Sequence, residues 1–356
     1  MASYKNLVFK GGGVRGIAYL GALEYLYANG LMLPVERVAG TSAGAITAAL
    51  VALNYESFSA MRKVADGLDY RKVPSEGELE PEPSKSAGVT SLARKYANAA
   101  FFRNIRCSMR LVQDLGWYSS VYVYNWLKST IAERFSVVKD SYTFADFRDA
   151  SLHKGGREFL DLYVTGTDLS NRTVRIFSFE TTPDMEVALA VRISMSIPFY
   201  FEAMEYQYPG TGGPQSYADG GIMWNYPITL FDNARYGMRK GAGSNPETLG
   251  FFLYESADPR KHKDIKGIAD YVGAVFESLV LVQERLVISD ERNRERTVYI
   301  NDTGVPFTDF NVGLEDPVFQ RLYRSGFGAA EQFFAKRTNW NMILHRIQTK
   351  LGWFGS

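Results

Sequence analysis

Cysteine and histidine are scarce in this chain, with one cysteine and three histidines among 356 residues. The single Cys107 cannot form a disulfide within the chain, so the fold does not depend on an oxidising compartment. No histidines, cysteines and carboxylates have the spacing of a metal site, and we expect neither a metal nor a cofactor.

The chain also lacks an excess of charge of one sign, since 40 lysines and arginines face 39 acidic residues. This balance argues against a nucleic-acid partner. The longest charge-free window, residues 38–55, only touches the lower limit for a membrane span and suits a turn and a buried helix better. No signal-peptide core follows Met1. We therefore expect a soluble protein, cytoplasmic or secreted without a leader, that meets lipid only at a membrane surface.

Residues 40–44 read Gly-Thr-Ser-Ala-Gly, where an apolar strand-like run gives way to a helix-like run. This Gly-x-Ser-x-Gly pattern is typical of a nucleophile elbow, a sharp strand-to-helix turn that exposes the serine hydroxyl. Gly40 and Gly44 allow the turn to be tight and a substrate to approach Ser42. The following helix points free N–H groups at any charge that develops there. On this pentapeptide alone, the alternative remains that residues 40–44 form an ordinary Gly/Ser turn at the start of a helix, with no catalytic role.

A glycine loop precedes the elbow, at residues 11–16 with the sequence Gly-Gly-Gly-Val-Arg-Gly. Its N–H groups lie between a predicted strand and a helix start, an arrangement that binds anions. In a parallel sheet the loop and the elbow open on the same edge, so the loop can stabilise an oxyanion at Ser42. Arg15 either holds the loop, lies near an anionic head group or is a surface charge.

The same loop matches the dinucleotide fingerprint Gly-x-Gly-x-x-Gly, which requires an acidic residue at the far end of the second strand. Glu36 has about the right spacing but begins the second predicted strand, so it lies at the wrong end of the sheet. This position disfavours a nucleotide-binding enzyme.

A nucleophilic serine needs a base, and the histidines are poor candidates. His153 lies in a polar connector, His262 in a basic run and His345 in a C-terminal helix, so a Ser-His-Asp triad is poorly supported. Asp219 follows Tyr-Ala and precedes Gly-Gly, between two apolar stretches. Such a sequence is usually just a hairpin turn. Beside the elbow and the glycine loop, however, this carboxylate is the better candidate to accept the serine proton.

These three motifs, in this order, resemble the patatin-like phospholipase family. Residues 164–169 look like the family's central strand, and residues 193–198 read Ile-Ser-Met-Ser-Ile-Pro where the family has Ala-Ser-x-Ser-x-Pro. The third motif ends in Gly221, where many members have alanine. The resemblance covers about residues 1–54 and 160–230.

The resemblance implies a Ser-Asp dyad, with Ser42 as nucleophile and Asp219 as base. The further positions that it implies are the oxyanion loop Gly11, Gly12 and Gly13 and the motif-supporting residues Arg15, Gly16, Gly40, Gly44, Gly220 and Gly221. It also implies an α/β fold, a three-layer α/β/α sandwich around a mainly parallel sheet. The implied activity is that of a lipid acyl hydrolase of the phospholipase A or lysophospholipase type, which needs no cofactor.

Membrane phospholipid or lysophospholipid is the expected substrate, with transient contact to a membrane surface and no nucleic acid. A non-lipid serine esterase or acyltransferase would use the same residues and stays open. A catalytically silent scaffold is disfavoured because all three motifs are intact. Whether a regulatory partner or a small-molecule activator acts on the enzyme also stays open.

We predict one catalytic domain over residues 1–330, with a helical or loop insertion at about 74–150. Residues 331–356 read as an amphipathic helix that packs on the domain. The side chains of its apolar face are Trp340, Ile343, Leu344, Ile347, Leu351 and Phe354. Lysines and arginines border this face, so docking on anionic membrane is the alternative.

Overall fold

The computed structural model describes residues 3–75, 115–255, 265 and 268–350, with the backbone alone at 268–270, 272 and 338–350. Cys107, His262 and most of the predicted insertion lie outside these ranges. The side chains of His345 and of the predicted C-terminal apolar face are also outside the description.

The chain alternates strands and helices, as the periodicity of its apolar residues predicts. The strands are β1 (Asn6–Phe9), β2 (Arg37–Gly40), β3 (Gly116–Tyr118), β4 (Asp161–Asp168), β5 (Thr173–Ser178), β6 (Phe199–Phe201), β7 (Met204–Tyr206), β8 (Gln215–Asp219), β9 (Thr248–Tyr254) and β10 (Thr297–Asn301). The α-helices are α1 (Ile17–Ala28), α2 (Ala43–Ala52), α3 (Phe58–Ala65), α6 (Val121–Ala132), α7 (Phe144–Arg148), α8 (Val187–Ser194), α9 (Gly221–Trp224), α10 (Ile268–Ser289), α11 (Glu291–Glu295) and α12 (Pro317–Lys350). A 3-10 turn, η1 (Gly13–Gly16), leads into α1.

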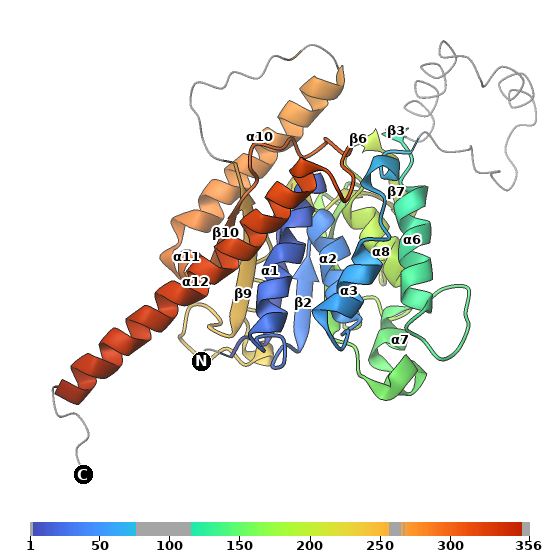
Figure 1. The fold of residues 1–356 in the computed structure, drawn as a ribbon. Helices are drawn as coiled ribbons and strands as arrows, with labels where there is room; N and C mark the ends of the chain where they lie inside the picture. The colour runs from blue at the N-terminus through green and yellow to red at the C-terminus, as the bar shows by residue number, and fades with distance from the viewer. Residues whose placement is uncertain (1–2, 76–114, 256–264, 266–267, 351–356) are drawn as a thin grey trace, which may run out of the picture.

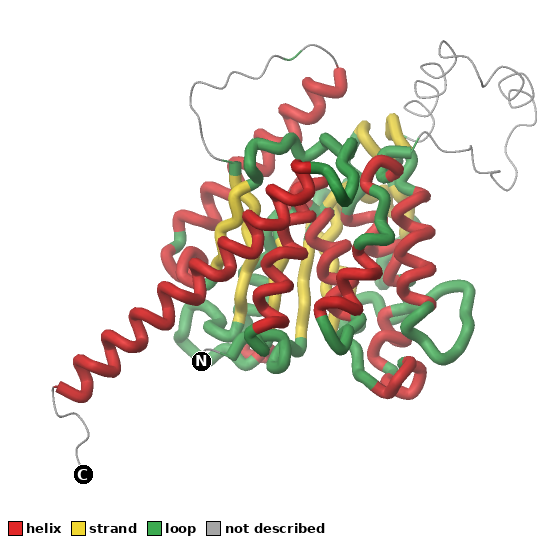
Figure 2. Tube along the Cα trace, viewed as in Figure 1, coloured by secondary structure: helices red, strands yellow, loops and turns green. Residues whose placement is uncertain are grey.

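Eight of these strands form one sheet, in the order β10-β9-β1-β2-β4-β8-β7 with β5 also paired to β4. The pairs from β10 to β4 are parallel, whereas β5, β8 and β7 run antiparallel to their neighbours. Helices cover the sheet, with α1, α2, α3 and α12 on one side and α10 on the other (Figures 1 and 2). The predicted three-layer α/β/α architecture around a mainly parallel sheet is confirmed.

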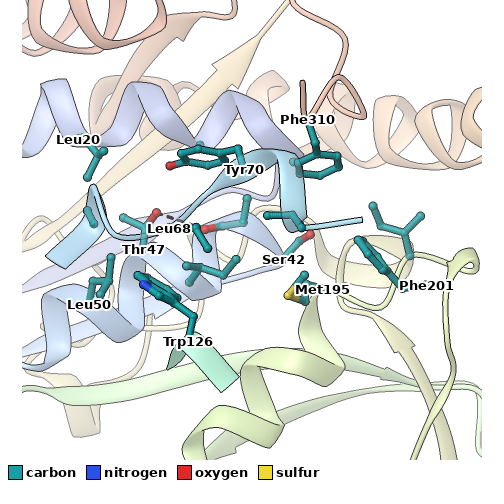
Figure 3. Close-up of a pocket in the computed structure, with 17 residues that line it drawn as sticks. Leu20, Ser42, Thr47, Leu50, Leu68, Tyr70, Trp126, Met195, Phe201 and Phe310 are labelled. Atoms are coloured by element: carbon teal, nitrogen blue, oxygen red, sulfur yellow. Dashed lines mark hydrogen bonds between the residues drawn. The ribbon is translucent and has the colours of Figure 1, made fainter. Parts of the chain in front are cut away.

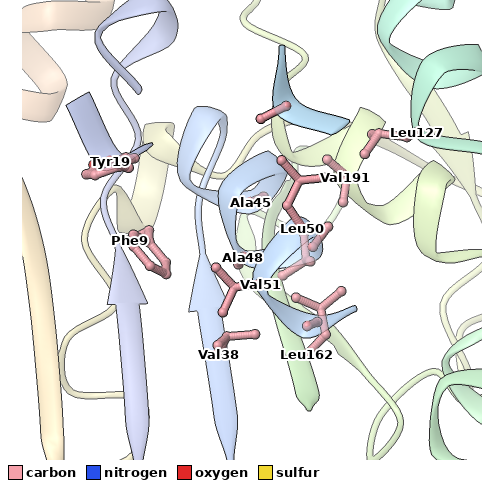
Figure 4. Close-up of a cluster of buried hydrophobic side chains, with 14 of the residues drawn as sticks. Phe9, Tyr19, Val38, Ala45, Ala48, Leu50, Val51, Leu127, Leu162 and Val191 are labelled. Atoms are coloured by element: carbon pink, nitrogen blue, oxygen red, sulfur yellow. The ribbon is translucent and has the colours of Figure 1, made fainter. Parts of the chain in front are cut away.

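Buried side chains alternate between the two faces of the central strands, because successive strand residues point to opposite sides. Leu7 and Phe9 of β1 enter the larger core, while Val8 between them enters the smaller one. Figure 4 shows the larger core, where Val51 of α2 packs close to Val38 of β2. Helix α2 is thereby fixed on the sheet directly behind the predicted elbow.

Strand β4 pairs on the same side with both β2 and β8, which run in opposite directions and end close to each other. Along one side, β5 pairs with residues Tyr163 to Asp168 of β4. The other side is shared, since β2 ends with Gly40 opposite Val164 and β8 ends with Asp219 opposite Gly166. The two end points are two residue steps apart on β4, which is about 7 Å along an extended strand. The ends of β2 and β8 therefore meet in the sheet.

Two predicted helix boundaries differ from the structure. The helix expected over about 265–293 is divided at Asp290, because Asp290 caps the start of α11 by accepting the Arg292 N–H at 2.9 Å. Helix α12 runs without interruption through position 330, where we placed the end of the catalytic domain. That domain division, and the insertion at 74–150, stay predictions. Among the described residues, no helix is long and apolar enough to cross a bilayer.

Candidate active site

Ser42 occupies a strained turn between β2 and α2. Its backbone has φ 55° and ψ −124°, a conformation that residues other than glycine rarely adopt. The flanking glycines allow α2 to lie directly on the strands. A Cβ atom at Gly40 would lie 2.1 Å from the Gly44 oxygen, and one at Gly44 would lie 2.3 Å from the Phe9 oxygen. Larger residues at either position would push the helix away and move Ser42.

Asp219 lies beside Ser42 at the end of β8 and is fully buried. Its Oδ1 accepts the Gly221 N–H at 2.6 Å, whereas Oδ2 has no hydrogen-bond partner among the described residues. The Ser42 hydroxyl is close enough to favour the ionised carboxyl, but it makes no hydrogen bond of normal geometry with Oδ2. Burial dominates and raises the pKa of Asp219 to about 7. Asp219 can therefore be either charged or neutral near neutral pH.

The glycine loop packs against the elbow. The Gly11 N–H is already used, since it donates to the Asn225 oxygen at 3.0 Å. Within the described part of the chain, the N–H groups of Gly12 and Gly13 have no acceptor. Gly13 has φ 58° and lines a pocket together with Ser42. These two N–H groups are therefore available to a ligand.

A third N–H group at the site belongs to Ala43, which we did not single out from the sequence. It begins α2 directly after Ser42 and has no acceptor among the described residues. The residue after the nucleophile often supplies an oxyanion-hole donor, so its position in the motif is the signal that could have identified it.

Arg15 fixes the glycine loop to residues 302–307, a segment that we did not connect with the site from the sequence. Its Nε donates to the Val305 oxygen at 2.6 Å, and its guanidinium pairs with Asp302 at 3.1 Å. The Val14 N–H also donates to the Phe307 oxygen, at 3.0 Å. Of the three interpretations of Arg15, the structure favours the one in which it supports the loop.

The remaining motif glycines are sites of close packing. A Cβ atom at Gly16 would lie 3.2 Å from the Ala43 Cβ. One at Gly220 would lie 2.5 Å from the Thr165 Oγ1, and one at Gly221 would lie 2.9 Å from the Asp219 Oδ1. These glycines therefore let the backbone pack closely at the turns that carry Ser42 and Asp219. The Asp-Gly-Gly sequence is a strand-to-helix turn into α9 rather than the hairpin turn that such a sequence usually forms.

An apolar pocket opens beside Ser42 and extends between α1, α2 and α6. Figure 3 shows Ser42 at one end near Met195 and Phe201, and Leu20 and Leu50 at the other. Trp126 lies between these two ends. The free space, counted with the open mouth, is about 660 Å³. The largely apolar lining of this pocket suits a hydrocarbon chain.

His153 lies in the segment that we interpreted as a polar connector, and its side chain is buried away from Ser42 and Asp219. Its ring stacks on Phe159 with 3.7 Å between centroids, and its Nδ1 accepts the Phe159 N–H at 3.3 Å. The ring therefore packs in the core near α7. Over the residues that the structure describes, no group of three or more histidine, cysteine and acidic side chains could hold a metal ion.

The profile of the patatin-like phospholipase family matches residues 7–232, more than half of the chain. This chain belongs to that family. The matched span contains the glycine loop, the elbow and the Asp219 turn. Patatin-like phospholipases are lipid-hydrolysing enzymes, so the membership assigns the chain to that general class of activity.

The similarity to other proteins extends beyond residues 7–232. YqhO of Bacillus subtilis is 27% identical over 317 residues, which cover 87% of this chain and 91% of YqhO. The probable lipid hydrolase 463L of Invertebrate iridescent virus 6 is 24% identical over 64% of this chain and 63% of its own length, so the chain spans less than two thirds of 463L. The structure of VipD from Legionella pneumophila has a TM-score of 0.55 at 18% identity, covering 94% of this chain and 67% of VipD, and shows that the fold is shared.

The patatin-like Ser-x-Ser-x-Pro block joins the two halves of the site. The buried Ser194 accepts the Ser42 backbone N–H on its Oγ at 2.9 Å. Its backbone oxygen accepts the Gly220 N–H at 3.2 Å, and the Ser196 oxygen accepts the Asp219 N–H at 2.8 Å. The sequence pointed to this block only through the family resemblance, and the contact with Ser42 was not foreseen.

Ser194→Ala is expected to lower kcat about 10- to 100-fold with little change in KM. The substitution leaves the buried Ser42 N–H without an acceptor. The strained turn can then relax, and the Ser42 hydroxyl moves from its orientation for attack. Rates of hydrolysis of a soluble ester measure the effect. Ser196→Ala is the matched control, because the only partner of the Ser196 hydroxyl among the described residues is the Arg192 oxygen, four residues earlier in the chain. Equal losses in the two variants would mean that Ser194 has no special part in positioning Ser42.

Proposed function

We propose that this protein is a phospholipase A or lysophospholipase that cleaves fatty acyl esters with Ser42 as nucleophile and Asp219 as base. One observation carries the proposal. A buried carboxyl with a free oxygen lies beside a serine in a strained strand-to-helix turn, at the mouth of an apolar pocket. Such a pair suits nucleophilic attack on an ester whose acyl chain occupies the pocket.

In the first half of the proposed reaction, the Ser42 Oγ attacks the ester carbonyl carbon while its proton passes to the Asp219 Oδ2. The N–H groups of Gly12, Gly13 and Ala43 stabilise the oxyanion that forms. The intermediate then collapses to an acyl-serine, and the protonated Asp219 returns its proton to the leaving alkoxide.

In the second half, Asp219 takes a proton from water as the water oxygen attacks the acyl-serine. Collapse of this second oxyanion releases the fatty acid and restores the Ser42 hydroxyl. Both halves require Asp219 to act once as base and once as acid. The pKa of about 7 supports this cycle, because proton transfer in both directions is efficient when the pKa lies near the working pH.

Hydrolysis of a defined lipid panel, with products identified by mass, tests the proposal. The wild type is expected to release fatty acid from a phospholipid or a lysophospholipid, and Ser42→Ala is expected to release none above background. Hydrolysis of water-soluble short-chain esters alone would instead identify a non-lipid esterase. Absence of both activities and of fluorophosphonate labelling would identify a silent scaffold.

A further inference from the structure

Helix α10 exposes an apolar stripe along the face that points away from the sheet. The stripe consists of Tyr271, Val275, Leu279, Val282 and Leu286, which recur every three or four residues and are between 45% and 70% exposed. Apolar residues at this spacing normally face a core or a partner. Here they are exposed to solvent instead, and exposed apolar residues that lie together on one helix face often mark an interaction site.

The opposite face of α10 is bound firmly to the loops that carry the candidate catalytic groups. The Gln283 Nε2 donates to the Gly221 oxygen at 3.0 Å and to the Ile222 oxygen at 2.7 Å. The Gln283 Oε1 accepts the Asn225 N–H at 3.0 Å. These bonds fix the rotation of the helix, so α10 cannot turn to bury the stripe without breaking them.

A second contact ties α10 to the start of the glycine loop. Glu284 forms an ion pair at 2.7 Å with Lys10, the residue before Gly11, and both side chains are largely buried. Phe276 stacks on Phe307 with 6.0 Å between ring centroids. The helix that carries the exposed stripe therefore contacts both the Asp219 turn and the segment that supports the oxyanion loop. Figure 1 shows its first turns projecting beyond the ends of the strands, at the end of the sheet where the site lies.

The size and the charge of the stripe indicate what binds it. Five side chains with these exposures present about 550 Å² of surface, while a stable dimer buries about 800 Å² per partner. Among the described residues, the exposed polar side chains of α10 beside the stripe are Ser278, Arg285 and Ser289, and they give little basis for matched contacts with a protein or for attraction to an anionic surface. A lipid surface needs neither a large matched area nor specific polar partners.

We propose that the α10 stripe docks the protein on the surface of a phospholipid bilayer, by inserting its apolar side chains below the head groups. The inference rests on the proposed function, in which the substrate is itself a membrane lipid. Docking through α10 holds the carboxyl ends of the strands near the bilayer, where a lipid can reach the pocket beside Ser42. The contact is apolar, so it does not depend on anionic lipid or on low salt.

Co-sedimentation with phosphatidylcholine vesicles tests the docking surface, with Ser42→Ala as the parent so that the vesicles stay intact. The parent is expected to bind, and 0.5 M NaCl is expected to leave the bound fraction unchanged. Adding Val275→Gln, Val282→Gln and Leu286→Gln is expected to lower the partition coefficient at least about tenfold, since polar side chains then replace most of the inserted surface. Thermal unfolding checks that the variants fold, and exposed positions such as these tolerate polar residues.

Leu33→Gln with Val138→Gln is the matched control, because these residues are 84% and 95% exposed on other parts of the surface. The control is expected to bind within twofold of the parent. The proposal is overturned if the parent does not bind, if the α10 variant binds as well as the parent, or if sedimentation shows a parent dimer that the α10 substitutions dissociate. None of these readouts requires hydrolysis, so their failure would leave the result of the lipid panel unaffected.

Discussion

Ser42→Ala is expected to abolish ester hydrolysis, with a loss of at least about 10³-fold in kcat, and to abolish labelling by a fluorophosphonate probe. The hydroxyl is the only part of the side chain removed, and it is the proposed nucleophile. Because Ser42 is 6% exposed and lies in a turn rather than in the packed core, the fold should be retained. Labelling followed by peptide mass mapping locates the modified residue.

Ser42→Gly separates the strain at this position from its chemistry. A positive φ of 55° is costly for serine and for alanine but not for glycine. Ser42→Gly should therefore be as inactive as Ser42→Ala, yet more stable than it by about 1 kcal/mol in urea unfolding. Residual activity within tenfold of the wild type in either variant would remove Ser42 from the mechanism.

Asp219→Asn is the second substitution with a large expected effect, and it should change activity and stability in opposite directions. Loss of the base should lower kcat at least about 10²-fold. In the wild type, kcat/KM should rise with pH and level off above about pH 7, since the proposed base Asp219 can accept a proton only when ionised and its pKa is raised to about 7. The asparagine variant should lose this titration.

The raised pKa of Asp219 should also make the folded protein less stable as the pH rises toward 7. Burial raises the pKa of Asp219 in the folded state above the ordinary value of 3.8, so the folded protein binds this proton more tightly than the unfolded chain. Its contribution to stability is fully present below about pH 4 and is lost as the pH rises to 7. An asparagine does not ionise, so the Asp219→Asn variant does not lose stability in this way. Its free energy of unfolding, relative to that of the wild type, should therefore increase by about 3 kcal/mol between pH 5 and pH 8. Urea unfolding at the two pH values measures the difference.

His153→Gln serves as the control for the choice of base. His153 packs on Phe159 and does not reach the site, so the folded variant should keep most of its kcat while losing some stability. A His153 variant as inactive as Ser42→Ala would restore a Ser-His-Asp triad. A pH-independent stability difference for Asp219→Asn would mean that Asp219 is not buried with a raised pKa.

Local sequence determined much of the fold. Apolar runs with turn residues between them located β1, β2, β4, β5, β9 and β10 to within a few residues, because strand and helix periodicities are local properties. The Gly-x-Ser-x-Gly pattern also located the turn at Ser42, since glycine is required where α2 packs directly on the strands. The break at Asp290 was missed because the charged residues that follow it are compatible with a continuing helix, whereas the Asp290 side chain caps the start of the separate helix α11.

The order of the motifs and their family resemblance predicted Ser42 and Asp219 as partners, but nothing local in the sequence shows why they meet. That depends on β4, which pairs along one side with the end of β2 and with the end of the antiparallel β8. Pairing between distant strands is a tertiary property, and a shift of one residue would turn Asp219 to the other face of the sheet.

The sequence by itself therefore determined the α/β class, the elbow, the glycine loop and the family. Tertiary structure alone decided which N–H groups remain free, because the Gly11 N–H donates to the Asn225 oxygen, while those of Gly12 and Gly13 have no acceptor in the described part of the chain. It also decided the raised pKa of Asp219 and the outward face of α10. Each of these depends on which groups from distant parts of the chain exclude water or supply a hydrogen bond, and no local pattern encodes that.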